Sequence, residues 1–201
     1  DLAGAALEVT DLKAQAKARH ALPPFTTSTL QQAASSALGF SPGKTMKLAQ
    51  SLYEQGLITY MRTDSVNISE QARAAAKDYI AANFGPEFHP ATPNFFKSKA
   101  DAQGAHEAIR PTDVFLAPQT ARDGGMDATE LKLYDLVWRR FVASQMADAR
   151  TTVRTVSLSA RKPAISHDYL FTASATQIDF EGFLRVMNLA AKKRRADGEE
   201  D

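Results

Sequence analysis

The stretch SPGKTMKLAQSLYEQG, residues 41–56, carries the clearest helix signal in this chain of 201 residues. Ser41 is suited to cap the first turn, and Pro42 suits the first helical position because the N–H that proline lacks is not needed there. Apolar side chains then recur at helical spacing, and Gly56 is suited to end the helix. The pattern predicts a helix between these two boundaries.

A second helix is predicted just before it, over residues 28–38. Ser28 and Gln31 have the spacing of a capping box, and Gly39 closes the apolar pattern. Two short helices joined by a short link resemble a helix-turn-helix, which many DNA-binding modules use. A non-catalytic DNA-binding module on these helices is one alternative, although the second helix carries only two lysines against one glutamate.

Two further helices are predicted downstream. One begins at Ser69 and ends at Gly85, and a longer, broadly apolar one covers residues 127–146 with Asp127 as its cap. Residues 86–118 lie between them, are rich in proline and lack apolar periodicity, so they are predicted to be mostly loop.

The sequence becomes strand-like at both ends of this helical block. Residues 151–160 and 169–178 are β-branched and alternating, as paired antiparallel strands are, and residues 7–16 have a similar pattern. The predicted fold class is α+β, with a helical domain inserted into one antiparallel β domain. The predicted domains are residues 1–24 (β domain, first part), 25–148 (helical domain), 149–188 (β domain, return strands) and 189–201 (charged tail).

Composition excludes several classes of protein. The net charge of +1 gives no global field that would attract nucleic acid, and the absence of cysteine excludes disulfides and thiolate zinc sites. The four histidines have no ligand spacing, so no metal is predicted to bind this chain. No apolar run reaches the ~20 residues that a membrane span needs, so no membrane partner is predicted.

Tyr60 stands where the chain turns from apolar to polar, in TYMRTDS. A tyrosine is usually a buried core aromatic. A phenol with a pKa of about 10 can also attack a phosphate if a nearby cation favours the phenolate and neutralises the phosphoryl oxygens. Arg62 can supply that cation through a bidentate guanidinium. The next residues add hydroxyls and a carboxylate suited to a phosphate or sugar: Thr63, Asp64 and Ser65.

Three stretches, in this order and spacing, resemble the type IA DNA topoisomerases, and within that family the bacterial topoisomerase I group. They are PPFTTSTLQQAAS at residues 23–35, KLAQSLYEQGLITYMRTDS at residues 47–65 and AHEAIRPTDV at residues 105–114. The resemblance implies a helical, tyrosine-bearing domain inserted into a β arch. It also implies that Tyr60 attacks single-stranded DNA to form a transient 5′-phosphotyrosine link, with Arg62 beside the phosphate. The DNA-binding residues expected on this basis are His106, Arg110, Thr63, Asp64 and Ser65.

The resemblance further implies strand passage and ATP-independent relaxation of negative supercoils. It also implies that the Mg²⁺-binding residues of the family are not found in this chain. Family members hold Mg²⁺ in a Toprim domain, whose acidic cluster is not found here, so the Mg²⁺ ligands are expected outside this fragment and the fragment alone is expected to be inactive. The start at Asp1 is interpreted as that of an internal piece. The expected partners are single-stranded DNA and the remaining domains of the same polypeptide, in the bacterial cytoplasm at the nucleoid.

Tyrosine recombinases and type IB topoisomerases are the enzymatic alternative, since they also form phosphotyrosine. Their nucleophile follows the catalytic His and Arg residues in the sequence, whereas Tyr60 precedes His106 and Arg110. Chain order therefore disfavours them.

Overall fold

The computed structural model describes residues 5–96, 106–161 and 168–187. They divide into two compact units. The strand unit contains the described residues up to 20 and from 148 to 182, and the helical unit contains those from 21 to 147 and from 183 onward. The chain is therefore α+β, and the predicted charged tail lies outside the described residues.

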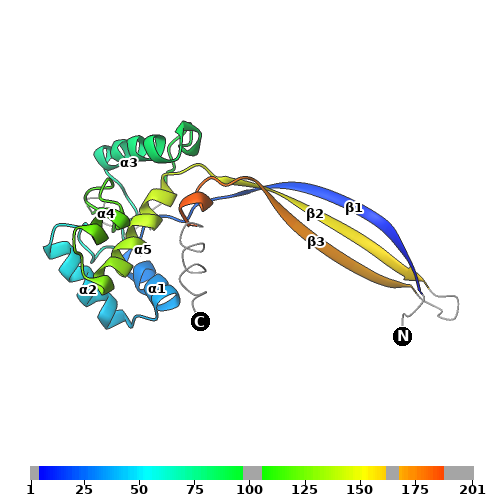
Figure 1. Cartoon of the computed structure of the whole chain (residues 1–201), viewed down its shortest axis with the longest axis horizontal. Helices are drawn as coiled ribbons and strands as arrows, with labels where there is room; N and C mark the ends of the chain where they lie inside the picture. The colour runs from blue at the N-terminus through cyan, green and yellow to red at the C-terminus, as the bar shows by residue number, and fades with distance from the viewer. Residues whose placement is uncertain (1–4, 97–105, 162–167, 188–201) are drawn as a thin grey trace. The chain divides into compact units, whose positions relative to one another are not determined.

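The described residues of the helical unit form the α-helices α1 to α5 (Figure 1) and one 3₁₀-helix, and residues 184–187 are also helical. They are α1 (Thr27–Leu38), α2 (Pro42–Glu54), α3 (Glu70–Asn83), the 3₁₀-helix η1 (Pro86–Phe88), α4 (Pro118–Asp123) and α5 (Ala128–Ser144). The helices α1, α2 and α4 each contact α5. Leu133, Tyr134 and Val137 of α5 are fully buried, and each such side chain stabilises the fold by about 1.5–3 kcal/mol.

Three predicted helix starts are confirmed and one is wrong. Ser41, Ser69 and Asp127 cap α2, α3 and α5 through their side chains. The capping box of α1 is formed by Thr26 and Thr29 instead of Ser28 and Gln31. The helix starts earlier because the preceding residue, Phe25, is extended and fully buried in an antiparallel bridge with Ile109.

The predicted loop over residues 86–118 contains the short η1, and the prediction missed α4 at its end. The helix α4 has only six residues, and Ala121 is its only buried side chain. A helix this short has no apolar periodicity to recognise.

The strand unit is an antiparallel sheet of three strands in the order β1–β2–β3. The strands are β1 (Ala6–Arg19), β2 (Ala149–Arg161) and β3 (Tyr169–Phe180). The ladder between β1 and β2 runs from the pair Ala6 and Arg161 to the pair Arg19 and Ala149, with an irregularity between Val9 and Asp11. The predicted antiparallel pairing of residues 151–160 with residues 169–178, and of residues 7–16 with the same sheet, is confirmed.

Candidate functional site

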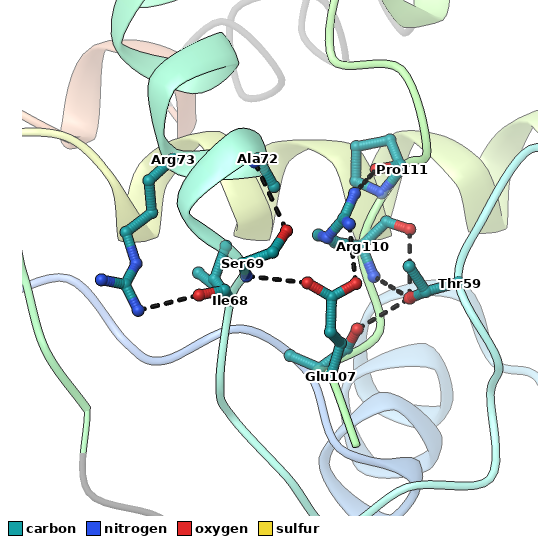
Figure 2. Close-up of polar contacts among 9 residues, drawn as sticks. Thr59, Ile68, Ser69, Ala72, Arg73, Glu107, Arg110 and Pro111 are labelled. Atoms are coloured by element: carbon teal, nitrogen blue, oxygen red, sulfur yellow. Dashed lines mark hydrogen bonds and ion pairs between the residues drawn. The ribbon is translucent and has the colours of Figure 1, made fainter. Parts of the chain in front are cut away.

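The segment that carries Tyr60 lies between α2 and α3 and is fixed on one side by Thr59. Thr59 N–H donates to Arg110 O at 2.9 Å, and the Thr59 hydroxyl donates to Ala108 O at 2.7 Å and accepts from Arg110 N–H at 3.0 Å. Ile58 adds an isolated antiparallel bridge to Pro111. These bonds attach the tyrosine segment to the chain around residues 108–111 (Figure 2).

Thr27, the first residue of α1, fixes the other side of the segment. Its N–H donates to Thr63 O at 2.9 Å, and its hydroxyl donates to Met61 O at 2.7 Å. Thr63 N–H in turn donates to the Thr27 hydroxyl oxygen at 2.9 Å. Because these partners lie on both sides of Arg62, the backbone of Arg62 is held against the first turn of α1.

Replacing Thr27 with valine is expected to lower the free energy of unfolding by about 2 kcal/mol, because Met61 O and Thr63 N–H lose their partner while the side-chain shape is kept. Urea denaturation of the chain measures this. The control Thr27→Ser keeps the hydroxyl and loses only a methyl group. Equal midpoints for the valine and serine variants would show that these hydrogen bonds do not hold the segment.

An open hollow of about 670 Å³ lies beside this segment. It is lined by Arg62, Thr63, Asp64 and His106, together with Thr27, Ser28 and Gln31 of α1. The structure thus brings Arg62 together with three of the predicted DNA-binding residues. A guanidinium, an imidazole and the first turn of a helix all favour an anion, and the Asp64 carboxylate adds an acceptor.

Tyr60 is 48% exposed, so the interpretation as a buried core aromatic is wrong. Its ring packs edge to face against Tyr53, with the ring centroids 5.3 Å apart. The contact of the Tyr60 side chain with a described residue is this ring packing, and Tyr60 is not among the residues that line the hollow. Tyr60 is thus an accessible phenol two residues before Arg62, which lines the anion-favouring hollow, and such a phenol can act as a nucleophile.

Arg110 is placed differently from the prediction, because its guanidinium is used inside the helical unit. It donates to Glu107 Oε2 at 2.7 Å and to Pro111 O at 3.0 Å, and its side chain is only 13% exposed. Glu107 Oε1 accepts from Ser69 N–H at 2.7 Å, so Glu107 lies between Arg110 and the cap of α3 (Figure 2). Arg110 is therefore not among the residues that line the hollow, and its guanidinium is paired within the helical unit.

Ser65 also differs from the prediction, because it is 0% exposed. Its hydroxyl oxygen accepts from Asn67 N–H at 3.1 Å, while Ser65 N–H donates to the largely buried Thr63 hydroxyl at 3.1 Å. These bonds turn the chain from Arg62 towards α3. The Ser65 hydroxyl is thus not available to DNA in this conformation.

The pKa of Glu107 is lowered. Burial alone would raise it, but hydrogen bonds from Ser69 and Arg110 and the positive charge of Arg110 outweigh burial. A carboxyl whose pKa is lowered on folding stabilises the fold above its unfolded value, here 4.5, and this contribution is lost as the pH falls through the folded value.

We therefore expect the free energy of unfolding to fall more steeply below pH 4.5 in the parent chain than in Glu107→Gln, which has no proton to gain. Urea denaturation in a series of buffers from about pH 6 downward measures both slopes. If the free energy of unfolding fell equally steeply with pH in the two chains, the lowered pKa of Glu107 would be contradicted.

Sequence reasoning missed three residues that build the site, namely Thr27, Thr59 and Glu107. Glu107 lies three residues before Arg110 in the sequence, a spacing that allows an ion pair, and this was the available signal. The two threonines bond to backbone groups at least 34 residues away in the sequence, so no local pattern marks them.

The described residues do not fit a magnesium site. Among them, no group of three or more histidine, aspartate or glutamate side chains could hold a metal ion. The hollow contains one carboxylate, that of Asp64. Within the same part of the chain, no helix has the length and apolar character needed to cross a membrane.

Comparisons with known proteins identify relatives of this chain. A family model described as DNA topoisomerase matches residues 1–200. DNA topoisomerase 1 of Escherichia coli K12 is 46% identical over 178 residues, which are 89% of this chain and 19% of that protein. DNA topoisomerase 1 of Haemophilus influenzae is 45% identical over 179 residues, which are 89% of this chain and 20% of that protein.

A solved structure is also similar. Full-length topoisomerase I from Thermotoga maritima matches with a TM-score of 0.75 and 38% sequence identity, over 90% of this chain and 29% of that one. The chain spans about a fifth of the length of the curated relatives named above.

Proposed function

This chain belongs to the type IA DNA topoisomerases, in the group of bacterial DNA topoisomerase I, and on that premise we propose that Tyr60 is its nucleophile towards single-stranded DNA. One observation carries the proposal. An exposed tyrosine stands two residues before Arg62, whose backbone is fixed at a hollow that also contains His106.

The proposed step exchanges one phosphodiester for another. The Tyr60 phenolic oxygen loses its proton and bonds to a backbone phosphorus. The bond from that phosphorus to the 3′ oxygen breaks, and the freed 3′ oxygen takes up a proton. The products are a 5′-phosphotyrosine link and a 3′ hydroxyl. Because the new bond is of the same class as the broken one, the reverse attack reseals the strand without ATP.

The groups around Tyr60 have distinct proposed roles. The Arg62 guanidinium binds the non-bridging oxygens and compensates the charge that develops on them. His106 and the first turn of α1 add donors to the same hollow, and Asp64 and Thr63 contact the adjoining sugar or backbone. Phosphoryl transfer depends mainly on this positioning and charge compensation. Arg110, through its bond to Glu107, and Ser65, through its bond to Asn67, are proposed to hold the backbone of the DNA site in place.

Strand passage and relaxation of negative supercoils are proposed for the longer polypeptide, because this chain spans about a fifth of its relatives. The Mg²⁺ that the resemblance implies would be held by residues elsewhere in that polypeptide. The strand unit is proposed to be part of the arch whose movement lets the second strand pass. The proposed location is the bacterial cytoplasm, at the nucleoid.

The helix-turn-helix alternative has less support. Thr27 at the start of α1 is bonded to the tyrosine segment, and α2 packs on both α1 and α5. Lys44, one of the two lysines of α2, lies 4.1 Å from the centre of the Phe40 ring, where it interacts with that ring.

The experiment locates the covalent link. The full-length protein is incubated with a single-stranded oligonucleotide and magnesium, denatured rapidly, digested with protease and analysed by mass spectrometry. The nucleotide adduct is expected on the peptide that contains Tyr60. Tyr53 is an internal control, because its ring lies 5.3 Å away. An adduct on Tyr53, or on another residue, would refute the assignment.

A further inference from the structure

A second hollow, of about 540 Å³, lies in the helical unit next to α3. Its polar lining consists of Arg73 and Lys77 of α3, His89 and Asn94 of the segment after η1, and Gln145 at the end of α5. It shares no lining residue with the hollow beside Tyr60. Its volume is in the range of small-ligand sites, about 300–1,000 Å³.

Two positive charges face this hollow, and no carboxylate lines it. Arg73 and Lys77 are four residues apart on α3, so they lie on the same face, where like charges repel each other unless an anion lies near both. Neither forms an ion pair with a described residue. Arg73 is held by a bond to Ile68 O at 2.8 Å and by the Phe95 ring at 4.7 Å, which orients its guanidinium.

The other polar side chains are neutral. Burial and the charge of Lys77 hold the pKa of His89 below its usual value, which favours its neutral form. Gln145 is only 4% exposed and donates one N–H to Ser144 Oγ at 2.9 Å, which leaves its other N–H and its carbonyl oxygen unbonded to described residues. The Asn94 side-chain amide donates to Ser144 O at 3.0 Å and to Met146 O at 2.9 Å, and these bonds fix Asn94 against the end of α5.

The remaining lining is apolar and rigid, because it includes Pro86, Pro90 and Pro93. A nucleotide unit combines the three chemistries that this hollow offers. Its phosphate requires cations, its base can lie against flat apolar or imidazole surfaces, and the edge of the base can bond to an amide.

We propose that this hollow binds one nucleotide of a single-stranded nucleic acid, with the phosphate between Arg73 and Lys77 and the base directed towards Gln145. The inference takes its partner class from the proposed function but rests on different residues. Binding there would give the helical unit a contact with the nucleic acid that is separate from the contact at the reacting phosphate.

The test uses the 201-residue chain and a fluorescent single-stranded oligonucleotide, with affinity measured by anisotropy over a range of salt. Lys77→Gln is expected to weaken binding by about 3- to 10-fold and to reduce the slope of log K against log salt by about 0.7, the loss of one phosphate contact. The control Lys47→Gln makes the same charge change on α2 and is expected to change affinity less than 2-fold, about the effect of an exposed charge. Equal effects of the two substitutions would overturn the proposal.

NMR of the Gln145 side-chain amide places the ligand. The oligonucleotide is expected to shift this signal in the parent chain and in Arg62→Ala, so the result does not depend on the Tyr60 hollow. Inorganic phosphate at the same phosphate concentration is expected to leave it unchanged, because it has no base. A shift with phosphate alone, or no shift with the oligonucleotide, would contradict a nucleotide site while leaving the assignment of Tyr60 intact.

Discussion

Replacing Tyr60 with phenylalanine is expected to abolish DNA relaxation by the full-length protein, a loss of at least about 1,000-fold, because the substitution removes the oxygen that we propose bonds to phosphorus. The Tyr60 ring and its edge-to-face contact with Tyr53 are kept. Tyr60 is 48% exposed, so loss of its hydroxyl is expected to leave the fold unchanged. The measurement is a gel assay of topoisomers from negatively supercoiled plasmid with magnesium and without ATP.

Two controls separate chemistry from folding in this assay. Tyr53→Phe removes the neighbouring hydroxyl and is expected to keep most of the activity. The isolated 201-residue chain is expected to be inactive although it contains Tyr60, because relaxation also needs residues from the rest of the polypeptide. Relaxation by Tyr60→Phe or by the isolated chain would show that the reacting group lies elsewhere.

The elements that depend on local sequence were predictable. Ser41 and Asp127 cap their helices through side chains that reach backbone N–H groups two or three residues away, so the sequence alone identifies them. The strands were recognised by their alternation, and their antiparallel pairing followed from their placement on either side of a helical block.

The features that depend on distant contacts were not predictable. The start of α1 is set by the bridge of Phe25 with Ile109, which lies far along the chain. His106 and Arg110 lie in one short motif, yet the structure places His106 at the hollow and directs Arg110 to Glu107. A motif thus identified the neighbourhood of the candidate site, whereas tertiary packing decided which side chains line the hollow.

Replacing Glu107 with alanine is expected to lower the free energy of unfolding by about 3 kcal/mol, because it leaves a mostly buried guanidinium unpaired. Arg110 is 13% exposed, and its Nε already has no partner among the described residues. Ser69 N–H loses its acceptor as well. Urea denaturation measures the change. The control Glu54→Ala removes a surface carboxylate that accepts from Gln50, and its effect is expected to be within about 0.5 kcal/mol.

A double-mutant cycle tests whether this loss comes from the ion pair itself. In the background Arg110→Met, Glu107→Ala no longer leaves a charge unpaired, so its cost is expected to fall to about 1 kcal/mol, which reflects the bond to Ser69. The same cost in both backgrounds would mean that Glu107 and Arg110 are not coupled. The pair matters for function because Arg110 N–H and O both bond to Thr59, next to Tyr60. Loosening Arg110 is therefore expected to release one of the two anchors that hold the segment of Tyr60, the proposed nucleophile.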